Sequence, residues 1–234
     1  MSVWLLLLSI FGFLTFRHES NELAVLKTNE NSGANLKQFL AGKSISMYLI
    51  MFLAFASLNG FLFYFVPVFS AENGLLETEI SLLFVLHMVG MMFFGPLIAK
   101  KIEARNVGHK GLLIWAMALS IASLLMVAYN SEMIFLIAAV FIRGCSNSLG
   151  LIYFPLYFSE MEETKVYGTE KSMSVYSAVD NIGGAIGPFI FAWAITFGIS
   201  SGFALLSAVA AATMLVFFKV NENKSGGIKD ENIS

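Results

Sequence analysis

Three ionisable side chains, His87, Arg143 and Asp180, lie inside stretches of sequence that are otherwise almost free of charge. An ionisable group in such a stretch is costly in a membrane and is by default a candidate for function. An arginine and an aspartate can form a charge-assisted hydrogen bond, and a histidine can exchange a proton near neutral pH. These three residues therefore predict ion pairing or proton coupling inside a membrane.

Arg143 and Asp180 are expected at nearly the same depth on consecutive spans. Arg143 lies about ten residues, or roughly 15 Å, from the start of its span near residue 133. Asp180 lies about seven residues, or roughly 10 Å, from the start of the next span near residue 173. We therefore expect a charge-assisted pair between them. Such a pair either neutralises both charges and joins two helices, or takes part in substrate binding or proton coupling.

Polar side chains on two other spans are further candidates for a substrate or coupling site. His87 either takes part in proton coupling or makes an ordinary hydrogen bond in a helix interface. The stretch AFASLNGFLFYFVPVFS (54–70) places Asn59 and Tyr64 among many aromatic residues. Those aromatic residues face either an apolar substrate or lipid, and Asn59 and Tyr64 are the candidates for direct contact with a substrate.

Small residues and a proline mark expected helix contacts. In SAVDNIGGAIGPFIF (177–191), Gly183 and Gly187 are four residues apart, a spacing that lets helices approach closely in lipid. Pro188 loosens the hydrogen bonding of the same helix, and Gly95 is a similar small residue near the end of another span. These positions form either a surface on which two halves of a protein move, or close packing within one bundle.

Long apolar runs must position these side chains. Of 234 residues, 57% are hydrophobic and 13% are charged, and nearly uncharged runs of this length are typical of membrane spans. The first run offers about 15 residues, or roughly 22 Å, against a hydrocarbon core of about 30 Å. It is followed by charges and has no cleavage site, so we interpret it as a partial span rather than a signal peptide, and the chain as a fragment. The predicted spans are 2–16, 44–70, 79–99, 111–129, 133–158, 173–198 and 201–218.

The basic residues predict the orientation in the membrane. Of the 14 lysine and arginine residues, all but Arg143 fall in alternate connections or in the C-terminal segment. The remaining connections carry only acidic residues, such as Glu72 and Glu132, or no charge. By the positive-inside rule, the basic connections and the C-terminus are expected in the cytoplasm.

The predicted fold class is an all-α membrane protein with a six-helix transmembrane bundle. Residues 1–16 are the partial span, and 17–43 form a cytoplasmic linker with a short turn at Leu36–Leu40. Residues 44–218 form the bundle, and 219–234 form a disordered cytoplasmic tail. The one cysteine and the absence of catalytic, nucleotide-binding or metal-binding motifs argue against an enzyme. We expect no cofactor, no metal and no nucleic acid partner.

Three motifs on successive spans resemble the major facilitator superfamily of transporters. GPLIAKKIEARNVGHK (95–110) resembles the family's G-x-L-x-D-R-x-G-R-K loop, although Lys100 and Lys101 stand where the family has Asp and Arg. FIRGCSNSLG (141–150) resembles the arginine-and-glycine motif of the family's antiporters, matching at Arg143 and Gly150. GGAIGP (183–188) resembles their glycine-proline motif.

The resemblance implies an alternating-access secondary transporter of a small molecule, built from two six-helix halves. The partial span followed by a basic linker favours the C-terminal half, and an N-terminal half remains open because the motifs are named for that half. The implied partners are the lipid bilayer, a small-molecule substrate, and either the missing N-terminal half or a second half-transporter chain. The resemblance also implies an integral membrane protein that crosses the plasma membrane several times.

Two other classes of protein remain as alternatives. The loop without its aspartate favours a non-transporting remnant or an accessory membrane subunit. A seven-span receptor or retinal protein fits the charge pattern, but its last span has no lysine to hold retinal and its first span is short.

Overall fold

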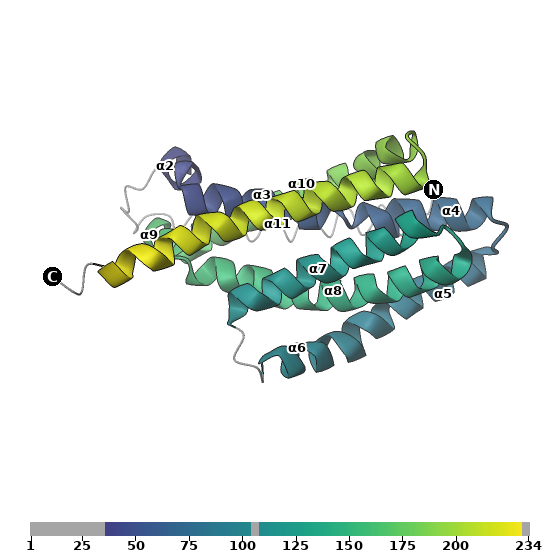
Figure 1. Ribbon diagram of the computed structural model, residues 1–234, viewed down its shortest axis with the longest axis horizontal. Helices are drawn as coiled ribbons and strands as arrows, with labels where there is room; N and C mark the ends of the chain where they lie inside the picture. The colour runs from purple at the N-terminus through teal and green to yellow at the C-terminus, as the bar shows by residue number, and fades with distance from the viewer. Residues whose placement is uncertain (1–35, 104–107, 231–234) are drawn as a thin grey trace, which may run out of the picture. The chain divides into compact units, whose positions relative to one another are not determined.

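A computed structural model describes residues 36–103 and 108–230 of the chain, and every regular element within those residues is a helix (Figure 1). The predicted partial span at 1–16 and most of the linker therefore lie outside the described residues. Each of the six other predicted spans falls on a helix, within a few residues at its ends. Helices long and apolar enough to cross a membrane occupy Lys43–Glu72, Glu77–Lys101, His109–Tyr129, Met133–Glu160, Thr169–Ile195 and Ile199–Val220.

Two of the spans are divided by π-helical segments. The first consists of α3 (Lys43–Ser57), η1 (Phe61–Phe65) and α4 (Val66–Glu72), and the second of α5 (Glu77–Val89), η2 (Gly90–Phe94) and α6 (Gly95–Glu103). The other four are continuous: α7 (His109–Tyr129), α8 (Met133–Glu160), α10 (Thr169–Ile195) and α11 (Ile199–Asp230). Short π-helical segments inside longer helices often mark functional sites.

The six spans pack in a pattern that is unchanged when the first three are exchanged with the last three. Helix α3 packs on α10 and α11, α8 packs on α5 and α7, and α7 packs on α11 (Figure 1). Exchanging α3 with α8, α5 with α10, and α7 with α11 reproduces the same set of contacts. This is the relation expected of two three-helix repeats.

Glycine residues set the closest contacts between helices. A Cβ atom added to Gly187 of α10 would overlap the Ser57 carbonyl oxygen and approach the Gly60 backbone, both on the first span. A Cβ atom added to Gly144 of α8 would overlap the His87 carbonyl oxygen of α5. The glycines thus let backbones touch, as small residues do in membrane bundles.

The glycine-proline stretch was expected either to pack within one bundle or to form a surface between two halves. The position of each glycine around the helix decides between these alternatives. Gly183 and Gly187 are buried against the first span of this bundle, with Gly183 facing Ala56. Gly184, between them, is exposed and has open space around its Cβ position. Helix α10 continues through Pro188 to Ile195. The buried glycines serve packing within the bundle, and only the face that includes Gly184 is left for another surface.

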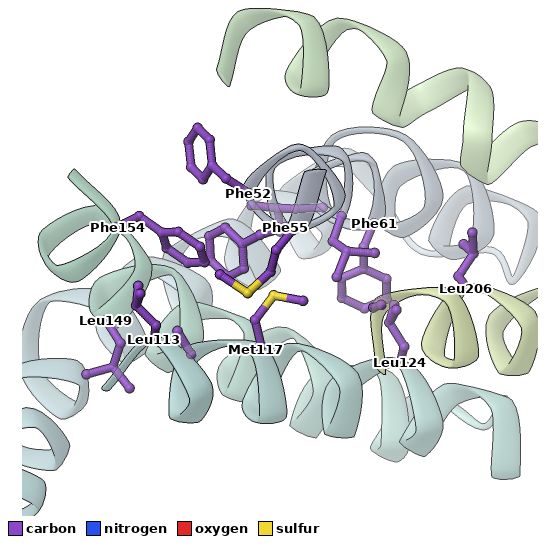
Figure 2. Close-up of a cluster of buried hydrophobic side chains, with 14 of the residues drawn as sticks. Phe52, Phe55, Phe61, Leu113, Met117, Leu124, Leu149, Phe154 and Leu206 are labelled. Atoms are coloured by element: carbon purple, nitrogen blue, oxygen red, sulfur yellow. The ribbon is translucent and has the colours of Figure 1, made fainter. Parts of the chain in front are cut away.

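The aromatic residues of the first span are mostly core residues. Phe55, Phe61 and Phe65 are buried, whereas Phe63 is 66% exposed. Figure 2 shows Phe52, Phe55 and Phe154 gathered beside α3. The sequence analysis expected these aromatic residues to face either a substrate or lipid. Most of them are instead buried inside the bundle.

Tyr48 provides a polar link in this aromatic core. Its hydroxyl donates a 2.6 Å hydrogen bond to the Phe154 carbonyl oxygen, and the side chain is fully buried. We expect Tyr48→Phe to lower the free energy of unfolding by about 1 kcal/mol, because it removes one buried hydrogen bond while keeping the ring. Thermal unfolding in detergent measures this effect. Tyr129→Phe, at a side chain that is 85% exposed, is the matched control and should change nothing; equal effects at both sites would contradict the assignment.

The chain differs from the prediction near its C-terminus and matches it before the first span. Helix α11 continues to Asp230, whereas the sequence predicted a disordered tail over residues 219–234. The short turn predicted at Leu36–Leu40 is the helix α2 (Leu36–Ala41). It contacts α9 (Glu162–Tyr167), where Phe39 stacks on Tyr167 with ring centroids 4.4 Å apart.

Candidate functional site

The guanidinium of Arg143 lies inside the bundle and bonds to three other groups. Its side chain is 0% exposed and projects from α8. Nη2 donates to the Phe55 carbonyl oxygen at 3.3 Å and to Asn59 Oδ1 at 3.1 Å, and Nη1 donates to Ser120 Oγ. The guanidinium also lies over the Phe55 ring, 4.9 Å from its centroid, a cation–π arrangement. One side chain of α8 thus connects the first span with α7.

An interruption in the first span brings the Phe55 carbonyl and the Asn59 side chain to Arg143. Helix α3 ends at Ser57, and Leu58 and Asn59 form a turn before η1. The Asn59 N–H bonds to the Ala56 carbonyl at 3.1 Å, whereas a continuous α-helix would direct it to Phe55. The Phe55 carbonyl instead accepts from the Leu58 N–H at 3.2 Å, and its second lone pair accepts from Arg143. The turn also places the Asn59 amide beside the same guanidinium.

Serine side chains hold the opposite side of Arg143. Ser120 Oγ of α7 lies 2.5 Å from Ser146 Oγ of α8, which donates to the Ala116 carbonyl at 2.7 Å. Both serines are buried. This chain of hydroxyl groups ties α7 to α8 and fixes one acceptor for the guanidinium.

Two further side chains extend the polar cluster to α5. Asn147 Nδ2 donates to Asn59 Oδ1 at 3.3 Å and lies 3.4 Å from His87 Nε2. His87 is 3% exposed, whereas Asn59 and Asn147 are half-buried. We call the set Arg143, Asn59, Asn147, His87, Ser120 and Ser146 the Arg143 network.

The Arg143 network lies near the middle of the spans. Arg143 is ten residues after Met133, where α8 begins, and His87 is ten residues after Glu77, where α5 begins. Ten helical residues extend roughly 15 Å, about half of a hydrocarbon core of about 30 Å. Because α5 and α8 begin at the same end of the bundle, the two side chains share a depth.

The predicted pair between Arg143 and Asp180 does not form. Asp180 is exposed on α10, and among the described residues the acceptors of Arg143 are all neutral. An ion pair does form elsewhere in the bundle, between His109 and Glu160, two partly exposed residues. The prediction was wrong because it matched depth alone: α10 packs chiefly on α3 and α11, whereas Arg143 points toward the first span and α7.

The other predicted positions divide between the network and helix packing. Asn59 and His87 belong to the network, whereas Tyr64 is half-buried in η1 and is not one of the residues bonded to Arg143. A Cβ atom added to Gly95 would overlap Ser148 of α8, so Gly95 is a packing position. Gly150 likewise lies against the Phe55 ring.

Three members of the network were missed from the sequence. Asn147 is four residues after Arg143 on the same helix, a spacing that places both side chains on one face, and this signal could have identified it. Ser120 and Ser146 gave no comparable signal, since buried serines are common in membrane helices. In the described part of the chain, no group of three or more His, Cys, Asp or Glu residues is arranged to hold a metal.

Comparison with known families gives one match. The sequence matches the Major Facilitator Superfamily over residues 47–232, which includes all six described spans apart from the first residues of α3. No curated protein and no solved structure gives a significant match.

Proposed function

Because the chain belongs to the major facilitator superfamily, a family of membrane transporters, we propose that its six spans work as one half of an alternating-access secondary transporter. Transporters of this superfamily consist of two six-helix halves, with the substrate bound near the middle of the membrane between them. The described bundle has the helix number and the internal repeat pattern of one such half.

The Arg143 network is the observation that carries this proposal. A charged side chain costs several kcal/mol at the centre of a bilayer, and such residues usually mark a substrate or ion pathway. Here the charged side chain of Arg143 lies at mid-depth, beside an interrupted helix. It bonds to Phe55 and Asn59, which belong to the other three-helix repeat. Interrupted helices are typical of substrate sites in secondary transporters. His87, a member of the network, is the candidate for proton coupling.

A second six-helix unit is part of the proposal. It comes from a longer form of this chain or from a second half-transporter chain. Asp180 and Gly184 are exposed on α10, and an ionisable group in a membrane span ordinarily faces a protein or water rather than lipid. We therefore propose that this face of α10 meets the second unit or the central cavity. We further propose that the C-terminus is cytoplasmic, from the distribution of basic residues, and that the protein lies in the plasma membrane.

An accessory or remnant membrane protein is the alternative, favoured by Lys100 and Lys101 standing where the family's loop has Asp and Arg. The two proposals differ in whether the middle of the bundle opens to both sides of the membrane. A transporter exposes its site to each side in turn, whereas an accessory protein has no need to do so.

Thiol accessibility distinguishes these proposals without knowledge of the substrate. The chain has one cysteine, Cys145, which is buried beside the network. In a Cys145→Ala background, Asn147→Cys places a thiol in the network without removing any bond made by Arg143 itself. We expect a membrane-impermeant maleimide to label this thiol from either side, in right-side-out and inverted vesicles. The protein is expressed together with its second six-helix unit.

A control thiol defines the sidedness of the assay. Glu132→Cys lies in a short connection between α7 and α8 and should react from one side only. Labelling of the Asn147→Cys variant from one side alone, or from neither side, would reject alternating access and support the accessory role.

A further inference from the structure

Arg143 carries a charge that no described side chain neutralises. Its acceptors are a serine hydroxyl, a backbone carbonyl and an amide oxygen, together with the face of the Phe55 ring. The side chain is 0% exposed. Buried charges in proteins are ordinarily paired with an opposite charge, because neutral acceptors only partly replace the lost hydration. The site therefore has the electrostatics of an anion-binding site without its anion.

The same network contains polar atoms that make no hydrogen bond. Arg143 Nε and Asn147 Oδ1 are buried and have no hydrogen-bond partner. Buried polar atoms in folded proteins nearly always have one. Two such atoms within a single cluster indicate that the cluster can accept a further polar group.

We propose that Arg143 binds the carboxylate of a monoanionic organic substrate; this inference rests on the transport function proposed above. One guanidinium carries one positive charge, so a single carboxylate neutralises it, whereas a dianion would leave a net negative charge buried. The planar guanidinium also matches the two oxygens of a carboxylate, with which it forms parallel hydrogen bonds.

The surroundings of Arg143 favour an acid with an apolar body. Phe55 lies under the guanidinium, and its ring centroid is 4.6 Å from that of Phe154. Phe52 belongs to the same aromatic group, 5.2 Å from Phe154 (Figure 2). All three rings are buried in the core, so an acid that reaches Arg143 leaves water for an apolar environment, which favours an aliphatic or aromatic body over a polar one.

The half-buried amides give the anion a route to Arg143. Asn59 and Asn147 are the members of the network that reach the surface of the described bundle, and they bond to each other. Asn59 Oδ1 occupies one donor of the guanidinium at 3.1 Å. The carboxylate replaces this amide oxygen, because an ionised acceptor bonds more strongly than a neutral one.

Binding can be tested on the purified chain, since every residue of the proposed contact is in it. The probes are acetate, hexanoate and benzoate, each compared with its primary amide, at pH 7 and constant ionic strength. Thermal unfolding is followed by the fluorescence of the three tryptophans. We expect at least one acid to raise the unfolding temperature saturably. Its apparent affinity should exceed that of its amide by about tenfold or more.

The decisive variant is Asn59→Asp, which supplies an internal carboxylate at the position that already contacts Arg143. It is nearly isosteric, and we expect it to fold with at least the stability of the wild type and to lose the acid-dependent shift. Asn130→Asp is the matched control: it adds the same charge in the connection after α7, where the Asn130 oxygen accepts from the Glu132 N–H. This control should retain the shift.

Three outcomes would overturn the proposal: no saturable shift with any of the three acids, equal shifts with acids and amides, or an undiminished shift in Asn59→Asp. None of them depends on transport. If an acid binds but the Asn147→Cys thiol is not labelled from both sides, the proposed transport function is rejected and the anion site remains. If the thiol is labelled from both sides but no acid binds, the transport function remains and this substrate class is rejected.

Discussion

Gly187→Ala is expected to destabilise the bundle by about 2 kcal/mol, although it adds only one methyl group. The new Cβ atom would overlap the Ser57 carbonyl oxygen and press on the backbone of Gly60. Backbone atoms cannot move aside as a flexible side chain can, so α10 must shift away from the first span, and overpacking of this kind typically costs about 1–3 kcal/mol. Unfolding of the purified protein in detergent, by heat or denaturant, measures the change.

Gly184→Ala is the matched control on the same helix. Gly184 has nothing within 4 Å of its Cβ position, and alanine has a higher helix propensity than glycine. We expect the stability of this variant to equal or slightly exceed that of the wild type. If both substitutions destabilised the protein equally, the close contact between α10 and the first span would be contradicted.

Arg143→Ala is expected to reduce transport by about a hundredfold or more, which corresponds to roughly 3 kcal/mol. The substitution removes the charge at the middle of the bundle and the hydrogen bonds from Arg143 to Phe55 and Asn59. The measurement is uptake or efflux in vesicles that contain the chain with its second six-helix unit. Arg143→Lys keeps the charge but lacks the planar fork, so we expect it to recover only a minor part of the activity. Full activity in Arg143→Ala would reduce the network to a structural role.

A double-mutant cycle separates the observed contact of Arg143 from the one predicted from depth. Combining Arg143→Ala with Asn59→Ala should give a coupling energy of about 1 kcal/mol or more, because the two side chains share a hydrogen bond. Combining Arg143→Ala with Asp180→Asn should give a coupling within about 0.5 kcal/mol of zero, because Asp180 makes no bond to the guanidinium. A large coupling in the second pair would restore the predicted ion pair.

The sequence was sufficient for the spans but not for the neighbours of each helix. Hydrophobic length alone located all six described spans, because a helix in lipid must satisfy its own backbone and be apolar over about 20 residues. It also placed Arg143 about ten residues into its span, where the structure has it. Depth, however, does not determine the direction of a side chain around the helix axis, and the pairing of Arg143 with Asp180 failed on that account.

The site shows the same limit at the level of single residues. Asn59 and His87 could be selected from the sequence as polar residues in apolar spans, and both lie in the Arg143 network. The Phe55 carbonyl could not have been found, because its role depends on a local turn at Leu58 and Asn59. Ser120 is an ordinary residue by type and became an Arg143 ligand only through the packing of α7 on α8. Residue types gave the candidates, and helix packing selected among them.

The order of the Arg143 contacts along the chain bears on how the protein is made. Phe55, Asn59 and Ser120 all precede Arg143 in sequence and lie on spans that leave the ribosome before α8. When α8 reaches the insertion machinery, its arginine alone opposes entry by about 3 kcal/mol. The polar groups that accept this charge are by then already synthesised. Insertion of α8 should therefore depend on the earlier spans, so that the chain assembles in one direction, with each new helix received by those made before it.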